Sequence, residues 1–295
     1  MTRRPSFRDA LAQERPLITP LAHDALSARL IEQAGFKAFA IGGSALLAAR
    51  YALPDIGLIG LSDMLDGMRD LASATSLPFI ADADDGYGDA KNVARLVHAY
   101  EALGVGGFLL EDQHRDHKQQ RADKAAAVVE MPIIEGKIRT ALRARTNPQT
   151  FVIGRTDAYG ALGLDEALRR AKRYLDIGSD GVFVAGLRTI GDYERVGREL
   201  SGAYVSAAMF EVGGTPWLTP KDLGEMGFSQ VSFPTSLLFP AVGAMRKALS
   251  SLRSHADGTI SMQPMTDGDE IRQALDDALG LATWRQAELT ASVGT

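Results

Sequence analysis

The chain has 295 residues, 45% of them hydrophobic, so it can bury a large core, and an α/β barrel of this length can form one domain. Its 37 acidic and 32 basic residues are mixed along the chain and give a net charge of −5, which argues against binding to nucleic acid or to an anionic membrane. There is no cysteine, which excludes disulfides, thiolate metal sites and a cysteine nucleophile or acid. The first 15 residues carry no apolar signal core and no stretch is apolar over the roughly 20 residues of a membrane span, so we expect a cytoplasmic protein.

Short apolar runs rich in β-branched and aromatic residues recur along the chain, with apolar residues at helical spacing between them. The predicted strands cover residues 16–20, 38–42, 78–82, 107–112, 151–155, 181–185, 203–207 and 230–234. Helical spacing is clear at residues 24–34, 92–103, 164–177 and 219–226. The alternation predicts an α/β fold, a (β/α)8 TIM-type barrel with its chemistry at the carboxyl ends of the strands. A doubly wound open sheet is the alternative, although no glycine-rich dinucleotide fingerprint follows the early strands.

The end of the chain has a different pattern. We expect the barrel to occupy residues 1–254, and residues 255–295 to form a linker and an extra C-terminal helix with helical spacing at 270–289. The apolar stripe of that helix, which includes Leu275 and Leu279, needs a surface to cover it. We expect it to pack across an oligomer interface, the alternative being that it lies on its own barrel.

Acidic residues gather where two of the predicted strands end. Asp82 and Asp84 follow an apolar strand and point the same way if the backbone stays extended, while Gly86 and Gly88 let the loop come close to a ligand. Glu111 and Asp112 end the next strand, so carboxylates from two segments converge on one rim. Like charges this close repel unless a cation lies among them, and oxygen ligands favour Mg²⁺. The alternative is that these acids are helix N-caps and solvated loop residues.

Arg155 lies at the end of another predicted strand, in the sequence GRTDA. An arginine there can bind a substrate carboxylate through two parallel hydrogen bonds. The alternative is a structural ion pair with an acid of the rim.

Together these motifs resemble the isocitrate lyase and phosphoenolpyruvate mutase superfamily, and most closely its methylisocitrate lyase branch. The resemblance extends along nearly the whole chain, and it rests on the order and spacing of DALSA (24–28), LPD (53–55), DADDGYG (82–88), LEDQ (110–113), GRTDA (154–158), GLDEALRRA (163–171) and GGTPWLT (213–219). It implies a Mg²⁺ ion, with Mn²⁺ as a substitute, and a dimer or tetramer that exchanges its last helix between subunits.

The resemblance also implies the site residues. Asp82, Asp84 and Glu111 correspond to the carboxylates that hold the metal, partly through water, with Asp55 nearby in a catalytic role. Arg155 and the backbone of the turn formed by Gly42, Gly43 and Ser44 correspond to the groups that bind a 2-oxo or 2-hydroxy carboxylate. Glu211 corresponds to a further substrate-binding residue.

The sequence departs from the family pattern at the proton donor. Lyases of the family carry a loop that reads approximately Lys-Arg-Cys-Gly-His after the EDQ, and its cysteine protonates the departing carbanion. Here residues 114–121 read HRDHKQQR, without a thiol. Gly42, Ala185 and Ala208 stand where the family usually has Ser, Glu and Asn. A lyase here must therefore use His117, His114 or water as the acid, although a loop histidine can equally be a solvated residue.

We therefore expect a Mg²⁺-dependent lyase that breaks a carbon–carbon bond of a substituted malate or a methylisocitrate-like acid. Decarboxylation of an oxaloacetate-like acid is the first alternative, because carbon dioxide leaves without a proton donor. Phosphonate chemistry ranks lower, because the Lys-Thr-Asn loop signature of the mutases is absent. A catalytically inactive barrel that serves as a binding or scaffold protein is the alternative from another class of function.

Overall fold

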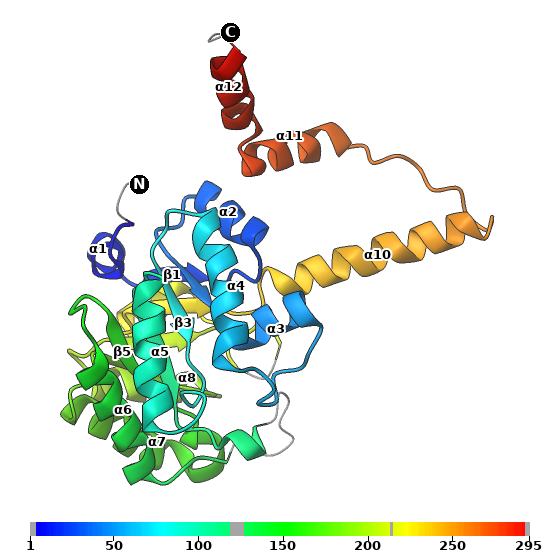
Figure 1. Cartoon of the computed structure of the whole chain (residues 1–295). Coiled ribbons are helices and arrows are strands. Elements are labelled where there is room, and N and C mark those ends of the chain that lie inside the picture. Colours follow the sequence, from blue (N-terminus) through cyan, green and yellow to red (C-terminus); the bar gives the residue numbers. More distant parts are fainter. Residues whose placement is uncertain (1–3, 119–126, 213–214, 293–295) are drawn as a thin grey trace. The chain divides into compact units, whose positions relative to one another are not determined.

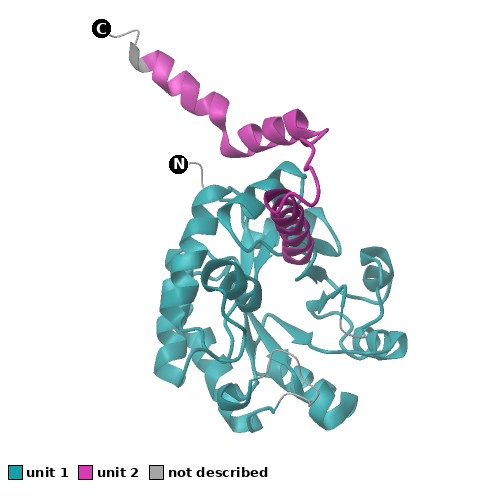
Figure 2. Ribbon diagram, turned by 90° about the vertical axis from the view of Figure 1, so that its right-hand side faces the viewer, with its two compact units in different colours: residues 1–237 teal, residues 238–295 magenta. Residues whose placement is uncertain are grey.

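The computed structural model describes residues 4–118, 127–212 and 215–292, and the side chains among them up to residue 290. The chain divides into two compact units, residues 1–237 and residues 238–295, which are coloured separately in Figure 2. The predicted domain boundary between residues 254 and 255 falls near the end of a helix of the second unit, Leu238–Ala256, and stays a prediction.

The first unit is built on eight parallel strands. They are β1 (Leu17–Pro20), β2 (Phe39–Ile41), β3 (Phe79–Asp82), β4 (Gly107–Glu111), β5 (Phe151–Thr156), β6 (Gly181–Val184), β7 (Val205–Ala208) and β8 (Gln230–Phe233). They pair in the order β1-β8-β7-β6-β5-β4-β3-β2, and a parallel bridge between Leu21 and Ala40 joins the two ends of this series. This closure confirms the predicted (β/α)8 barrel and excludes the doubly wound sheet.

Helices connect the strands and lie outside them, as α5, α6 and α7 do in Figure 1. Those of this unit are α1 (Phe7–Gln13), α2 (Ala25–Gln33), α3 (Gly43–Tyr51), α4 (Leu61–Ala74), α5 (Ala90–Ala102), η1 (Arg115–His117, a 3₁₀ turn), α6 (Met131–Ala144), α7 (Ala158–Asp176), α8 (Ile190–Glu199) and α9 (Pro220–Glu225). The side chains of Asp24 and Thr219 cap α2 and α9. The helix predicted at 164–177 starts earlier, because α7 includes a first turn that is separated by a non-helical residue, Gly163.

The core between strands and helices holds the end of β3 in place. The rings of Phe39 and Phe79 stack with their centroids 5.1 Å apart, and the ring of Tyr100 on α5 packs edge-on against Phe108 of β4 at 5.9 Å. The hydroxyl of Tyr100 also donates a hydrogen bond to the carbonyl oxygen of Asp82 at 2.7 Å. Helix α5 therefore fixes the last residue of β3 through both apolar contact and a buried hydrogen bond.

The loop after β3 differs from the extended backbone that the sequence suggested. The strand ends at Asp82, and Asp84 adopts the left-handed conformation with φ 44°. Gly86 has φ 88°, and a Cβ atom there would lie 2.5 Å from a side-chain carbon of Val93. A tight turn, rather than continued alternation along a strand, thus sets the direction of the Asp84 carboxylate.

The second unit contains three helices: α10 (Leu238–Ala256), α11 (Gly268–Leu279) and α12 (Leu281–Ser292). The residues predicted to be helical, 270–289, form two helices, α11 and α12, instead of one. Gly280 ends α11 in the left-handed conformation with φ 67°, and its amide bonds back to the last turn.

In the described part of the chain no helix is both long and apolar enough to cross a membrane.

We predict that Gly86→Ala destabilises the protein by about 2 kcal/mol or more, because alanine disfavours this φ and its Cβ meets Val93. Gly136→Ala is the matched control: it lies in α6 with nothing within 4 Å of an added Cβ, and should stabilise the fold by up to about 1 kcal/mol. Urea unfolding of the two variants measures both effects. Equal stabilities would show that the turn tolerates a side chain.

Candidate active site

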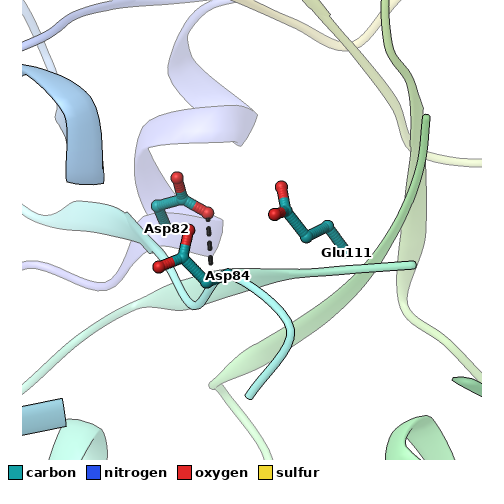
Figure 3. Close-up of side chains that lie close together, drawn as sticks. All are labelled: Asp82, Asp84 and Glu111. Atoms are coloured by element: carbon teal, nitrogen blue, oxygen red, sulfur yellow. Dashed lines mark hydrogen bonds between the residues drawn. The ribbon is translucent and has the colours of Figure 1, made fainter. Parts of the chain in front are cut away.

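Three carboxylates meet at the ends of β3 and β4 (Figure 3). Asp82 is the last residue of β3, Glu111 is the last residue of β4, and Asp84 lies in the loop between them, with one oxygen from each within 4.8 Å of the others. The amide of Glu111 donates to the carbonyl of Asp84 at 2.8 Å, and the amide of Asp84 donates to the Asp82 carboxylate at 3.2 Å. Backbone contacts thus hold this acidic cluster (Asp82, Asp84 and Glu111) together.

Burial makes the charges of the cluster costly. Asp84 is 2% exposed and Glu111 is 1% exposed. Loss of solvent, followed by the charge of Asp82, raises the pKa of Asp84 to about 6. Burial also raises the pKa of Glu111 well above its ordinary value, although Arg155 and Lys118 oppose the shift. The fully ionised cluster therefore needs cations beside it.

The residues fit a hard divalent ion. The ligand set is oxygen only, and the side-chain oxygen Oδ2 of Asp84 is buried without a hydrogen-bond partner among the described residues. A buried carboxylate oxygen is normally hydrogen-bonded, so an unpartnered one is well suited to bind a metal.

Among the described residues, Lys118 is one of two cations that contact the acidic cluster. Its ammonium nitrogen lies 3.2 Å from Asp55 and 3.1 Å from Glu111, and it also bonds to Asp84. Its side chain is only 7% exposed. Burial by itself would lower the pKa of Lys118, but Glu111, Asp84 and the neighbouring acids raise it well above its ordinary value, so the group carries a full charge.

Arg155, near the end of β5, supplies the second cation. Its guanidinium lies 3.0 Å from a Glu111 oxygen and makes two hydrogen bonds to Asp157, at 2.8 and 2.9 Å. The ion pair with a rim acid, considered above as the alternative role, is therefore present in this state. It also keeps the guanidinium at the edge of the acidic cluster.

The side chain of Arg115 connects three loops around the acidic cluster through hydrogen bonds. Its guanidinium donates to the Asp85 carboxylate at 2.9 and 2.6 Å, and to the carbonyl oxygens of Gly57 and Ile59 at 3.0 and 3.1 Å. Lys137 of α6 adds a contact of 3.2 Å to the same carboxylate. Burial alone would raise the pKa of Asp85, but the two cations bring it below its ordinary value.

Asp112 has a structural role instead of joining the cluster. It is fully buried and accepts hydrogen bonds from Thr156 at 2.8 Å, Tyr174 at 2.8 Å, Arg170 at 3.0 Å and the amide of Asp157 at 2.9 Å. These bonds join β4 to β5 and α7, next to Glu111 and Arg155.

Of the other predicted site residues, those of the glycine turn lie beside the acidic cluster, whereas Glu211 and His117 are exposed. A Cβ at Gly43 would lie 3.6 Å from an Asp82 oxygen, so the start of α3, with Gly42 and Ser44, is beside the cluster. Gly42 is the N-cap of α3 and provides no side-chain cap. Glu211 is exposed in the segment after β7. His117 is exposed too, with its ring 4.8 Å from that of His114. Residues 119–121 of the predicted loop lie outside the described residues.

The sequence interpretation did not identify Lys118, Arg115 or Lys137 as site residues. Lys118 lies in the same loop as His114 and His117, and the available signal was a cation in a loop that follows two strands ending in acids. Lys137 lies on α6, and nothing in its helical context distinguishes it from a surface lysine.

Comparison with known proteins agrees with the geometry. A family model described as phosphoenolpyruvate phosphomutase matches residues 7–253. The chain is 37% identical over 253 residues to a probable 2-methylisocitrate lyase of Corynebacterium glutamicum, covering 86% of this chain and 82% of that one. It is 32% identical to 2,3-dimethylmalate lyase of Eubacterium barkeri, with 98% of both chains covered.

Among solved structures, oxaloacetate acetylhydrolase in complex with 3,3-difluorooxalacetate matches with a TM-score of 0.88 and 29% identity, covering 99% of this chain and 97% of that one. A crystal structure of 2,3-dimethylmalate lyase matches with a TM-score of 0.83 and 31% identity over 96% of each chain. The named lyases among these relatives confirm the predicted carbon–carbon lyase class. The chain belongs to the phosphoenolpyruvate mutase and isocitrate lyase superfamily, with methylisocitrate and dimethylmalate lyases among its relatives.

Proposed function

We propose that this protein is a Mg²⁺-dependent lyase that cleaves a carbon–carbon bond next to a 2-oxo or 2-hydroxy carboxylate, with a substituted malate or methylisocitrate-like acid as substrate. The observation that carries the proposal is the buried cluster of Asp82, Asp84 and Glu111 with Arg155 at its edge. The relatives named as methylisocitrate and dimethylmalate lyases support the substrate class.

The acidic cluster would hold the ion, directly or through water, and Mn²⁺ is an acceptable substitute. When bound, such an ion acts as a Lewis acid that stabilises negative charge developing on the substrate oxygen beside the breaking bond. The chain's own groups have to bind the substrate carboxylate, to remove the hydroxyl proton and to supply a proton to the leaving carbon.

Arg155 and the start of α3 are the proposed carboxylate-binding groups. The guanidinium can exchange a contact with Asp157 or Glu111 for a substrate carboxylate, which has the same planar geometry. The backbone amides of Gly42, Gly43 and Ser44 open a helix beside the cluster and favour a negative group. Glu211 is retained as a further proposed substrate contact.

Two proton transfers complete the cleavage of a 2-hydroxy acid. A base takes the hydroxyl proton, the bond between the two carbons breaks, and its electron pair stays on the leaving carbon, which then takes a proton from an acid. Asp55, whose carboxylate lies beside Lys118, is the proposed base. His117 is the proposed acid, with water as the alternative, since the chain has no cysteine.

A second candidate reaction acts on an oxaloacetate-like 2-oxo acid. The likeness to oxaloacetate acetylhydrolase, at a TM-score of 0.88, favours a small 2-oxo diacid in a barrel of this shape. Decarboxylation of such an acid needs the same electrophilic groups and no proton donor for the departing carbon dioxide. Product analysis separates the two reactions.

We also propose a homo-oligomer, a dimer or tetramer, in which the second unit of one chain contacts another copy. Its helices expose many apolar side chains, which are Phe239, Val242, Met245, Leu249, Leu252, Ile271, Leu275, Leu279, Trp284 and Leu289. Apolar surface of this extent is uncommon on a monomer. We propose no nucleic-acid or membrane partner.

Asp82→Ala tests the proposed metal site. We expect it to abolish Mg²⁺ binding measured by calorimetry, and Mg²⁺-dependent turnover of a panel of 2-oxo and 2-hydroxy diacids, while circular dichroism stays unchanged. The control Asp70→Ala removes an exposed carboxylate paired with Arg50 and should retain both properties. A fully active Asp82→Ala protein would place the metal elsewhere.

The pH dependence of metal binding follows from Asp84. Because burial raises the pKa of this group to about 6, the metal-free protein carries a proton there below that pH, and the ion must displace it. We expect Mg²⁺ affinity to fall about tenfold per pH unit as the pH decreases below 6. Calorimetry in two buffers of different ionisation enthalpy also detects the released proton. A constant affinity between pH 5 and 7 would exclude Asp84 as a ligand.

The oligomer is tested by sedimentation velocity. We expect the full chain to sediment as a dimer or tetramer, and the double variant Leu249→Glu and Leu275→Glu to shift toward the monomer, because it places charges on the apolar face. A wild-type monomer at micromolar concentration would contradict the proposal.

A further inference from the structure

We propose that the ammonium group of Lys118 is the counter-ion of the metal-free site, and that a divalent ion must displace it in order to bind. The inference rests on the proposed function, because the ion in question is the one expected among Asp82, Asp84 and Glu111. It adds a residue of this chain that controls how tightly the metal is held.

The contacts of Lys118 coincide with the proposed metal ligands. Its nitrogen contacts Oδ1 of Asp84 and lies 3.1 Å from Oε1 of Glu111, and these are two of the three acids of the cluster. The third contact, at 3.2 Å, is with Asp55. Lys118 therefore contacts two of the carboxylates that would bind a metal, and its side chain is almost fully shielded from solvent.

The ammonium group of Lys118 competes with a divalent ion for the negative charge of these carboxylates. Mg²⁺ binds oxygen at about 2.1 Å, whereas the ammonium nitrogen occupies hydrogen-bonding distance from the same groups. Two cations on neighbouring oxygens of a buried site also repel each other, with little solvent to screen the repulsion. We therefore expect the lysine side chain to leave when the metal occupies the site.

The backbone before Lys118 permits that movement without loosening the site. The amide of Lys118 bonds to the carbonyl of Arg115 at 3.1 Å, and the Arg115 side chain is held by Asp85 and by two carbonyl groups. None of these anchoring contacts involves Asp82, Asp84 or Glu111. The flexible four-carbon side chain of Lys118 can rotate away while Arg115 keeps the turn in place.

The arrangement has two measurable consequences. It stabilises the folded protein without metal, because removing a cation from beside buried carboxylates is strongly destabilising. It also weakens the apparent metal affinity, because part of the binding free energy is used to displace the lysine.

The first test compares Lys118→Met with Lys137→Met by calorimetric titration with Mg²⁺ and with Mn²⁺. Both changes remove an ammonium group near the loop after β3, but Lys137 contacts Asp85 and not the acidic cluster. We expect Lys118→Met to bind the ion about tenfold or more tightly than the wild type, and Lys137→Met to stay close to the wild type.

Thermal unfolding provides a second readout of the same variants. In EDTA, Lys118→Met should melt at a lower temperature than the wild type, and saturating Mg²⁺ should raise its melting temperature by more than it raises that of the wild type. Unchanged or weaker metal affinity of a folded Lys118→Met protein would overturn the inference, as would an unchanged gain in melting temperature.

Chemical labelling follows the lysine directly in the wild-type protein. Reductive methylation followed by peptide mass spectrometry should modify Lys118 slowly in EDTA and quickly with saturating Mg²⁺, while Lys137 reacts equally in both. Equal labelling of Lys118 in a protein that demonstrably binds the ion would overturn the displacement alone. A wild-type protein that binds no divalent ion would instead overturn the proposed function and, with it, this inference.

Discussion

The mutual repulsion of buried carboxylates at the ends of β3 and β4 is the constraint around which the site is arranged. Asp84 and Glu111 lie almost out of contact with solvent, and this burial raises the pKa of both carboxyl groups. Around them the chain places Lys118 and Arg155, each within contact distance of Glu111. The positive charges, the tight turn at Asp84 and the anchoring of Glu111 are parts of one electrostatic arrangement.

The barrel makes this arrangement possible because backbone hydrogen bonds hold the acidic residues in place against the repulsion between their carboxylates. Tyr100 holds the carbonyl of Asp82, and the amide of Glu111 holds the carbonyl of Asp84. Asp112 turns away from the cluster and joins β4 to β5 and α7. The consecutive acids Glu111 and Asp112 thus have different roles. Glu111 belongs to the proposed metal site, whereas Asp112 stabilises the packing of β4 against β5 and α7.

Much of the fold was predictable because buried parallel strands have a strong local signature. Each of the predicted strands lies within two residues of an observed one, since runs such as GFLL and FVIG are apolar on both faces. The convergence of acids at one rim followed from their positions at strand ends, whereas the choice of Asp82, Asp84 and Glu111 came from the family resemblance. The direction of Asp84 did not follow, because a left-handed residue in a turn carries no period that a pattern can reveal. The contact of Lys118 with three acids was also not predictable, because it depends on a long side chain that crosses between loops. The break between α11 and α12 was missed because it depends on a single residue, Gly280, inside an apolar helical pattern.

The tether made by Arg115 bears on how such a barrel can diverge. The loops at the mouth of a barrel commonly change length and sequence independently of one another, which lets one scaffold host many chemistries. Here a single guanidinium joins the segment that contains Gly57 and Ile59, the turn that contains Asp85, and the 3₁₀ turn η1 that precedes Lys118. An insertion in any one of these loops would strain the contacts to the other two, so we expect this side of the barrel mouth to tolerate changes in loop length less than the loops that Arg115 does not contact.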